Sequence, residues 1–458
     1  MRLTVRRALA VIVCAVVSVV IVINVGTLSA WRDGKRTPEL PWDDATLRTA
    51  ALAAAAVAPR DVRPLTYLLP PPADVGNHVL SYMPNPLAAD VISIENDTSR
   101  LSQLLVWPHQ SDSDRIPEQM NYAPRAKPSD AHLKTIYVQT GLKYWNVAAG
   151  RHVFQEQKCR VDTCRVTDSR HDAGDPAAVL FRNHYSAHAM TAFRRTPSQV
   201  WIWYQLECPY HSQWLGKMSG VFNWTATYRH DSDIVAPYER YQPYDARVLT
   251  LPLRRNFAAN KTKKVAWFVS NCGSRNNRLG YATELGQHIQ VDIYGSCGPK
   301  KCARRKHGEC VKMLNVDYKF YLSFENSNCK DYITEKFFDT GLRNDIVPIV
   351  MGASKEDYTR AAPYYSFIHV DDFAGPAELA AYLRKLDAND TLYNEYFQWK
   401  GTGTFVNTYF WCRMCAMLHY PTKTKWYEDI NDWWRGQGTC VKGKWSDGGD
   451  GAGLDVPY

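Results

Sequence analysis

The chain has 458 residues, of which 45% are hydrophobic and 22% are charged, and its formal net charge is +9. This length exceeds one ordinary domain, and the hydrophobic content is sufficient for two cores. The charged fraction excludes a multi-pass membrane protein and a chain that is disordered throughout. We therefore expect a globular protein of two domains with extensions.

Residues 1–30 predict a cytosolic tail and a transmembrane signal-anchor. Basic residues precede an uncharged run from Ala8 to Trp31, which is long enough to span a bilayer. Basic residues before the span favour a cytosolic N-terminus and a lumenal remainder. The alternative is a cleaved signal peptide, although its apolar region is usually shorter. Both interpretations place the bulk of the chain in the secretory pathway.

Residues 31–129 are rich in Pro, Ala and Asp, which is typical of a stem that spaces a domain from a membrane. Strand-like runs at 132–141 and 200–206 then indicate a first domain over 130–255. The apolar run at 200–206 ends abruptly at Glu207, where a polar segment begins. The first domain is therefore expected to present Glu207 at the end of a buried strand.

Residues 256–400 predict a second domain in which strands alternate with helices. We expect strands at 263–270, 291–295, 318–324 and 345–352, with helices at 278–288 and 332–344 between them. A long amphipathic helical stretch follows at 374–399. Such alternation indicates a parallel sheet wound on both sides, which is a Rossmann-like α/β fold. Residues 401–458 form a C-terminal extension that contains cysteines.

Cysteine usage agrees with an oxidising lumen. The chain has twelve cysteines, and all except Cys14 follow the apolar segment. Because the remaining number is odd, at least one cysteine is free or paired between chains. Cys412 and Cys415 form a CxxC motif, but no second CxxC supplies further zinc ligands, so we predict structural disulfides. Four N-glycosylation sequons fit the same compartment, at Asn96, Asn223, Asn260 and Asn389.

A basic run lies between cysteines at 295–310. Nucleic-acid binding is a general possibility for such runs, but a lumenal location argues against it. We expect a solvated loop bounded by disulfides, with an electrostatic contribution to binding an anionic substrate as the alternative. No nucleic-acid partner is predicted.

Two polar loops follow neighbouring strands of the predicted second sheet, at 271–277 and 325–331. In open parallel sheets ligands bind at the carboxyl ends of the strands. Asp331 is a plausible N-cap for the following helix, whose free N–H groups would favour an anion. Arg278 and Lys336 lie at the start of the two helices and could contact phosphates. Neither a GxGxxG motif nor a P-loop is present, so neither a common dinucleotide site nor an ordinary P-loop is supported. The two basic residues at adjacent strand–helix junctions indicate a ligand with a nucleotide-like diphosphate.

Three blocks of sequence resemble the α1,3-fucosyltransferases that use GDP-fucose. The block YKFYLSFENSNCKDYITEKFF resembles the family signature, and VAWFVSNCGSRNNRLGYATELGQHIQVDIYGSCG and FNWTATYRHDSDI resemble two further blocks in the family's order. The resemblance covers about residues 130–440. The segments WCRMC and NDWWRGQGTC also resemble the branch that acts on the innermost GlcNAc of N-glycans.

This resemblance implies a GT-B fold, in which two Rossmann-like domains face a cleft. The acceptor would lie largely on the first domain and GDP-fucose largely on the second. Glu207 matches the family's catalytic base, although the segment here reads ECPYHS rather than ESP, and Cys208 could form an additional disulfide nearby. The residues that match donor contacts are Asn326, Tyr332, Glu335 and Lys336, with Arg278 at the phosphates.

The implied reaction is a single inverting displacement. Arg278 and Lys336 would stabilise the negative charge that develops on GDP, and Glu207 would accept the proton of the attacking 3-hydroxyl. Glu335 is expected to lie near the fucose or ribose, where it could stabilise oxocarbenium character. Arg278 and Lys336 could instead be surface charges. Glu207 could belong to a structural ion pair, and Glu335 could interact only with the helix dipole.

Two further motifs are interpreted as structural. The DSD sequence at 231–233 looks like the DxD metal motif of other glycosyltransferases, but we expect a loop motif because the family's basic residues handle the diphosphate. His184 and His188 share helical spacing without a surrounding HExxH motif, so they are expected to be structural. No obligatory metal is predicted, although a divalent metal could stimulate the reaction.

The sequence therefore predicts a single-pass type II protein of the Golgi membrane with a lumenal catalytic domain. Its function would be transfer of fucose from GDP-fucose to GlcNAc, with the N-glycan core of glycoproteins as the expected acceptor. A transferase for antennal GlcNAc is the alternative within the class. A more remote alternative is a lumenal carbohydrate-binding protein without turnover.

Overall fold

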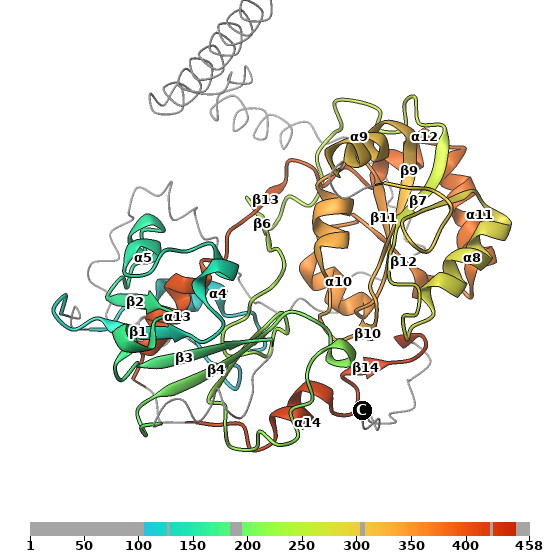
Figure 1. The fold of residues 1–458 in the computed structure, drawn as a ribbon. Helices are drawn as coiled ribbons and strands as arrows, with labels where there is room; N and C mark the ends of the chain where they lie inside the picture. Colours follow the sequence, from blue (N-terminus) through green and yellow to red (C-terminus); the bar gives the residue numbers. More distant parts are fainter. Residues whose placement is uncertain (1–104, 126–128, 184–194, 303–306, 422–424, 446–458) are drawn as a thin grey trace, which may run out of the picture. The chain divides into compact units, whose positions relative to one another are not determined.

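A computed structural model describes residues 105–125, 129–183, 195–302, 307–421 and 425–445 (Figure 1). The predicted signal-anchor at 1–30, most of the predicted stem, and Asn96 lie outside this part of the chain. Within the described ranges, every helix is too short or too polar to span a bilayer.

The first sheet has five strands, all parallel, in the order β2-β1-β3-β4-β5. Apolar residues alternate between its two faces, as in β4, where Ile202 and Tyr204 face one core and Trp201 and Trp203 face the other. Burial on both faces explains why the run at 200–206 has no polar alternation. The strands are β1 (Lys134–Val138), β2 (Cys164–Thr167), β3 (Ala178–Arg182), β4 (Val200–Gln205) and β5 (Trp224–Thr227).

Short helical segments connect these strands. They are α4 (Ile116–Asn121), the 3-10 helix η1 (Leu142–Trp145), α5 (His152–Glu156), α6 (Arg170–Ala173) and the 3-10 helix η2 (Pro209–His211). The segment around α4 corrects the predicted stem, which was extended to residue 129. Val106 and Trp107 are buried in the core of the first sheet, and Arg115 is fully buried and donates to the Ser232 carbonyl at 2.8 Å. The prolines and alanines around this segment led to the prediction of a stem, although some of its residues pack in the core.

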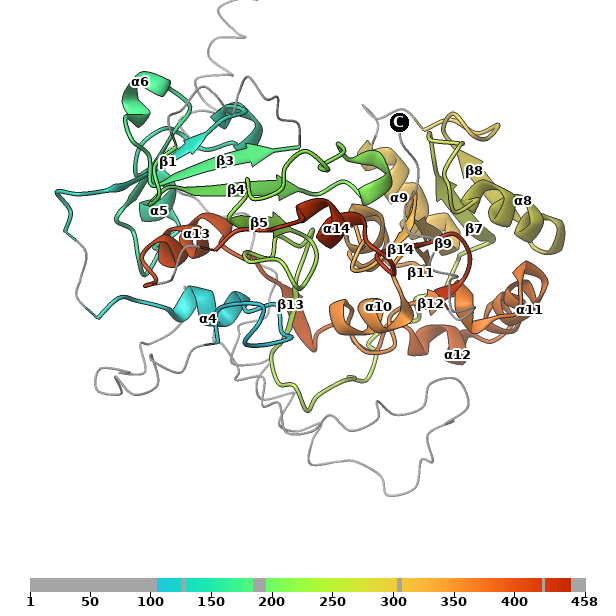
Figure 2. The same cartoon turned by 90° about the horizontal axis from the view of Figure 1, so that it is seen from below.

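The C-terminal extension also packs on the first sheet. Helix α13 (Phe410–Leu418) places Trp411 and Met414 in the same core as β1 and β3, and α14 (Ile430–Arg435) contributes Trp434 to the core on the opposite face. Figure 2 shows α13 and α14 as red helices at two ends of the first sheet. Two disulfides join α13 to the first sheet region, Cys159–Cys412 and Cys164–Cys415.

The second sheet is also parallel throughout, with the order β12-β11-β9-β7-β8. The predicted alternation of strands and helices is confirmed, and α8 has the predicted bounds. Numbered along the chain, both sheets have the spatial order 2-1-3-4-5, which is the doubly wound order of flavodoxin-like folds. The strands are β7 (Lys263–Phe268), β8 (Val291–Tyr294), β9 (Tyr318–Phe324), β11 (Val347–Met351) and β12 (Ile368–His369).

Helices cover both faces of this sheet. Helices α8 (Arg278–His288) and α11 (Pro376–Asp387) pack in one core, and α9 (His307–Asp317) packs against the opposite face. The remaining elements are α10 (Lys355–Ala361), the 3-10 helix η5 (Val370–Asp372) and α12 (Asp390–Glu395). Two small antiparallel pairs join β6 (Tyr241–Pro243) to β13 (Gly403–Phe405) and β10 (Asn328–Cys329) to β14 (Cys440–Val441).

The helix predicted at 332–344 is shorter than expected, and Asp331 is not its N-cap. The structure has a π-helix, η4 (Lys336–Leu342), whose N-cap is Glu335. Asp331 adopts a left-handed backbone conformation, with φ of 57°, and its carboxylate binds His230 and Arg360 instead. Tertiary partners therefore displaced the local cap. Residues 331–334 remain outside any helix, and π-helical segments often occur at functional sites.

Ten of the described cysteines form disulfides, as predicted for an oxidising compartment. The CxxC pair is confirmed as structural, although its two cysteines bind different partners. The suggestion of a disulfide at Cys208 is wrong, because Cys208 is free and buried. The three other pairs are Cys272–Cys297, Cys302–Cys310 and Cys329–Cys440.

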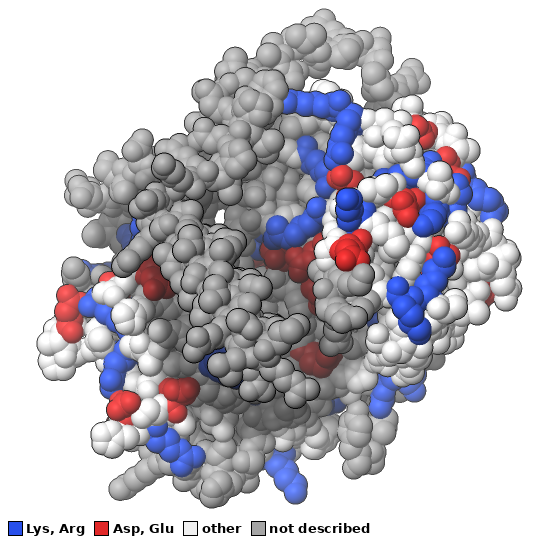
Figure 3. All heavy atoms as spheres, turned by 45° about the horizontal axis from the view of Figure 1, so that its top comes forward, with Lys and Arg blue, Asp and Glu red and all other residues white. Residues whose placement is uncertain are grey.

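Charges of both signs are interspersed over the described surface that Figure 3 presents. Part of the basic run at 295–310 is already paired, since Lys300 lies 3.2 Å from the carboxylate of Asp292. Residues 303–306 of that run lie outside the described ranges.

Candidate active site

The loops after β7 and β9 meet at the topological switch point of the second sheet, where ligands bind in this class of fold. Arg278, the first residue of α8, connects them. Its Nη1 donates to the Phe324 carbonyl at 2.7 Å and its Nη2 to the Asn271 carbonyl at 3.1 Å. The side chain is buried, and its Nε has no partner among the described residues. Burial lowers the pKa of Arg278, while the Glu325 carboxylate opposes this shift.

Several polar atoms at the same two loops are buried without a partner in the described structure. They include two side chains that the sequence analysis did not single out, Ser274 and Asn276. Asn276 uses its amide nitrogen to join the loops, donating to the Glu325 carbonyl at 3.0 Å and to Asn328 Oδ1 at 2.9 Å. Because native proteins seldom leave buried polar atoms unpaired, such a group indicates a binding site for a polar ligand. The four atoms are Ser274 Oγ, Asn276 Oδ1, Arg278 Nε and Asn326 Oδ1.

Lys336 lies in a partly buried network with two carboxylates. Its Nζ is 3.0 Å from Glu325 Oε2, 3.1 Å from Glu335 Oε1 and 2.9 Å from Thr334 Oγ1. Burial alone would lower the pKa of Lys336, but the two carboxylates raise it above its ordinary value. The ammonium group is therefore fixed in its charged form, with all three N–H donors engaged.

Glu325 is the anionic centre of this network, and the sequence analysis assigned it no role. Its side chain is fully buried, and it accepts hydrogen bonds from the backbone N–H of Thr334 at 2.9 Å and from the Thr334 hydroxyl at 2.8 Å. Burial raises the pKa of Glu325, and Lys336 opposes that rise. A carboxylate directly after a buried strand, followed by a lysine on the next helix, was the available sequence signal.

Glu207 lies just beyond the end of β4 and contacts residues from the loop after β9. Its Oε1 accepts from the Tyr332 hydroxyl at 2.8 Å, the Asn326 amide at 3.2 Å and the Cys208 backbone N–H at 2.9 Å. Its Oε2 has no hydrogen bond with any described residue. The structure therefore brings together the predicted base and two of the predicted donor contacts.

The hydrogen bonds determine the charge of Glu207. Burial alone would raise its pKa, but the bonds from Cys208, Tyr332 and Asn326 bring that pKa below the ordinary value. Glu207 is therefore ionised at neutral pH. One oxygen is fixed by three donors, and the other remains available to accept a proton.

The predicted site thus divides into two connected groups. Asn326 and Tyr332 lie with Glu207, whereas Glu335 and Lys336 lie with Glu325. No contact joins Glu335 to Glu207 among the described residues. The short loop at 325–335 carries members of both groups.

Comparison with known proteins identifies the family. The model "Fucosyltransferase, N-terminal" matches residues 135–239, and "Glycosyltransferase family 10 (fucosyltransferase) C-term" matches residues 258–433. The chain belongs to glycosyltransferase family 10, the fucosyltransferases. The resemblance found in the sequence is therefore confirmed, and the residues around Glu207 belong to an α1,3-fucosyltransferase.

Two named relatives of this fucosyltransferase are similar in sequence at 54% and 34% identity. Glycoprotein 3-alpha-L-fucosyltransferase A of Drosophila melanogaster is 54% identical over 347 residues, covering 74% of this chain and 68% of the relative. Alpha-(1,3)-fucosyltransferase 7 of Bos taurus is 34% identical, covering 68% of this chain and 90% of the relative. A crystal structure of an alpha1,3-fucosyltransferase with GDP-fucose superposes with a TM-score of 0.43 and 15% identity, covering 69% of this chain and 98% of that one.

The DSD motif of the fucosyltransferase is engaged in protein contacts. Asp233 is fully buried and accepts from the Thr225 backbone N–H and the Tyr427 hydroxyl, each at 2.9 Å. Asp231 forms a two-pronged pair with Arg229, with distances of 2.9 and 2.6 Å. These contacts fit the interpretation as a loop motif, because both carboxylates are already paired.

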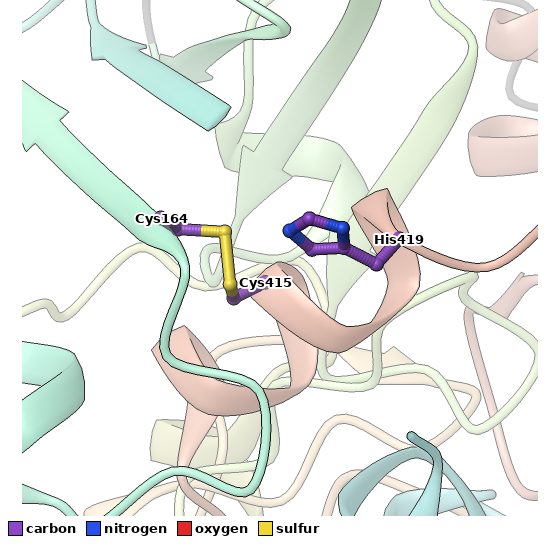
Figure 4. Close-up of side chains that lie close together, drawn as sticks. All are labelled: Cys164, Cys415 and His419. Carbon is purple, nitrogen blue, oxygen red and sulfur yellow. A yellow bond between two sulfur atoms is a disulfide. The ribbon is translucent and has the colours of Figure 1, made fainter. Parts of the chain in front are cut away.

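One group of side chains in the described structure has a spacing that could suit a metal, namely Cys164, Cys415 and His419 (Figure 4). The two cysteines are joined in a disulfide, so neither offers a thiolate. The imidazole of His419 lies beside that disulfide and contacts Thr163 Oγ1 at 3.1 Å. We therefore interpret the group as structural. His184 and His188 lie outside the described ranges.

The sequons differ in accessibility. Asn260 and Asn389 are exposed and remain predictions. The prediction for Asn223 is wrong for the folded enzyme, because this side chain is only 2% exposed. Its Oδ1 accepts from the Trp201 backbone N–H at 2.8 Å, and its amide donates to the Lys425 carbonyl at 2.7 Å. A glycan on that nitrogen would break both the packing and the hydrogen bond.

Proposed function

We propose that the enzyme transfers L-fucose from GDP-β-L-fucose to the 3-hydroxyl of GlcNAc, with inversion at the fucose. The proposed acceptor is the asparagine-linked core GlcNAc of glycoprotein N-glycans, in keeping with the name of the 54% identical relative. The observation that supports this proposal most directly is the Glu207 carboxylate, which is ionised, held by Asn326 and Tyr332, and free at Oε2.

On the acceptor side, the oxygen of the GlcNAc 3-hydroxyl attacks the anomeric carbon of the fucose as the bond to GDP breaks. Glu207 Oε2 accepts the proton of that hydroxyl. The three donors at Oε1 hold the carboxylate in one orientation during this step. A positioned general base of this kind contributes about 10²- to 10⁴-fold to the rate.

On the donor side, the unpaired polar atoms around Arg278 receive the diphosphate and sugar of GDP-fucose. Lys336 can reach a phosphate only by releasing one of its present acceptors. Glu335 is the group to release, because its side chain is 53% exposed whereas Glu325 is fully buried. The released Glu335 carboxylate would then face the fucose and stabilise positive charge there. Fixed cationic donors near a departing diphosphate can contribute several kcal/mol.

The same proposal includes the cellular setting. The two doubly wound sheets are arranged as a GT-B fold, with the donor on the second and the acceptor on the first. Residues 1–30 anchor the enzyme as a type II protein of the Golgi membrane, and its disulfides fit a lumenal catalytic region. The partners are GDP-fucose and glycoprotein acceptors, and no metal is required for turnover.

The test uses the full chain with GDP-fucose and a panel of defined glycopeptides. We expect fucose on the innermost GlcNAc, with the linkage assigned by NMR of the product. Transfer only to antennal GlcNAc would replace the core assignment with the antennal one, which a 41% identical human relative named for 4-galactosyl-N-acetylglucosaminide supports. Glycan binding without release of GDP would instead indicate a carbohydrate-binding protein.

A further inference from the structure

The first sheet has a switch point of its own, and its residues have no role in the chemistry described above. In the order β2-β1-β3-β4-β5, the crevice falls between β1 and β3. The segment after β1 is η1, which carries Tyr144 and Trp145, and the last residue of β3 is Arg182. Two of these side chains come from the segment that follows β1, and the third comes from the end of β3, so they flank the crevice.

They form a stacked group with one exposed member. The Arg182 guanidinium lies 5.7 Å from the ring centroid of Tyr144 and 5.2 Å from that of Trp145, and its Nη1 donates to the Tyr144 carbonyl at 2.9 Å. Trp145 is fixed from behind by Phe410, with ring centroids 5.7 Å apart. Tyr144 is 71% exposed although its neighbours hold it in place. Tyr144 therefore presents a preformed aromatic face to solvent.

Buried polar atoms without partners in the described structure gather at the same strand ends. They comprise hydrogen-bond donors and acceptors together, at Gln139 Oε1, Thr140 Oγ1, Trp145 Nε1 and Arg182 Nε. A phosphate or carboxylate only accepts hydrogen bonds, whereas a sugar hydroxyl both donates and accepts. A sugar ring also has an apolar face that can lie on an aromatic ring. The chemistry of the group thus favours a neutral saccharide.

The position relative to Glu207 indicates which saccharide unit is bound. Arg182 of β3 is paired in register with Tyr204 of β4, and Glu207 follows three residues later. Adjacent strands lie about 4.8 Å apart, so β1 and β4 are separated by about 10 Å. The Arg182 guanidinium also lies 5.9 Å from the ring centroid of Tyr204, which joins this group to the strand that leads to Glu207. We infer that a sugar on Tyr144 would lie beside the GlcNAc that reacts at Glu207 and would not be that GlcNAc itself.

We propose that Tyr144, backed by Arg182 and Trp145, is an acceptor subsite that binds a neighbouring sugar of the N-glycan. This inference rests on the proposed function. Stacking by the exposed half of a tyrosine ring corresponds to about tenfold in affinity on ordinary area arithmetic. The subsite acts on acceptor affinity and leaves the donor site unchanged.

The test compares Tyr144→Ala with Tyr144→Phe in the full-length enzyme. We expect Tyr144→Ala to raise KM for a core glycopeptide about tenfold with kcat nearly unchanged, and Tyr144→Phe to restore the wild-type KM. Hydrolysis of GDP-fucose without acceptor and the Kd for GDP should not change. Tyr364→Ala is the matched control, because Tyr364 is a tyrosine of similar exposure, 51%, on the second sheet's side of the chain.

A competition assay shows whether the subsite binds the glycan or the peptide part of the acceptor. The free oligosaccharide released from the glycopeptide should inhibit the wild-type enzyme, with a Ki about tenfold higher in Tyr144→Ala. An unchanged KM and Ki, a changed Kd for GDP, or a changed Ki only for the unglycosylated peptide would each overturn the subsite. Oligosaccharide binding measured by calorimetry remains informative if the wild-type enzyme transfers fucose elsewhere, so failure of the proposed function is distinguishable.

Discussion

Replacing Glu207 with glutamine tests the general base directly. The substitution preserves an oxygen that can accept the three bonds now made to Oε1, from Tyr332, Asn326 and Cys208. It places an amide nitrogen, which cannot accept a proton, where Oε2 is now free. We therefore expect kcat to fall about 10²- to 10⁴-fold, equivalent to about 3–5 kcal/mol of transition-state stabilisation.

Binding of the donor should survive this change. GDP contacts are expected from the loops after β7 and β9, so the Kd for GDP should change by less than about threefold, or about 0.6 kcal/mol. The three hydrogen bonds become weaker when the acceptor loses its charge, which predicts a loss of about 1–3 kcal/mol of stability. Isothermal titration with GDP and thermal melting measure these two quantities.

The pH dependence gives a second readout. Because the pKa of Glu207 is lowered, its ionised form persists as the pH falls through the ordinary range for glutamate, near pH 4.3. The acid limb of kcat/KM should therefore lie below that pH and disappear in Glu207→Gln. Glu356→Gln, at an exposed glutamate of α10, is the matched control. Turnover near the wild-type rate in Glu207→Gln would remove Glu207 from the base role.

Three further outcomes are expected. Lys336→Ala should raise the Kd for GDP at least tenfold. It is combined with Glu325→Gln in the same chain so that no unpaired buried carboxylate remains. An unchanged Kd would refute the contact between Lys336 and a phosphate. Burial alone would raise the pKa of Asp331, but His230 and Arg360 lower it to about 2. Asp331→Asn should therefore lower the Tm at pH 7, and this difference should vanish as the pH falls from about 4 to 2; a pH-independent difference would contradict the linkage. Removal of divalent ions with EDTA should leave turnover largely intact, and a complete loss restored by manganese would overturn the structural interpretation of 231–233.

Much of the second sheet could be predicted from the sequence because its signals are local. The run at 318–324 is apolar without interruption, and α8 has the periodicity and polar flanks that define a helix. The proximity of Glu207 to Asn326 and Tyr332 was predicted only through the resemblance, because the family places the matching sequence blocks at one cleft. No local pattern would have joined residues 119 and 125 positions apart.

The errors arose where distant partners overrode local preference. Asp331 has the right residue type for an N-cap, but His230 holds its carboxylate at 2.6 Å. The sequon at Asn223 has the required three residues, yet its amide is fixed by Trp201 and Lys425. Glu325 was not assigned a role because burial of a carboxylate becomes visible only with the surrounding strand and helix in place.

The return of α13 to the first sheet affects how the polypeptide can be made and divided. Cys159 and Cys164 await partners that lie 253 and 251 residues further along the chain. During synthesis the N-terminal half therefore leaves the ribosome before α13, which completes its core, and before the partners of two of its disulfides. A chimera that exchanges halves with a relative must therefore take α13 from the same protein as the N-terminal half. Otherwise α13 of one protein would have to pack against the first sheet of the other.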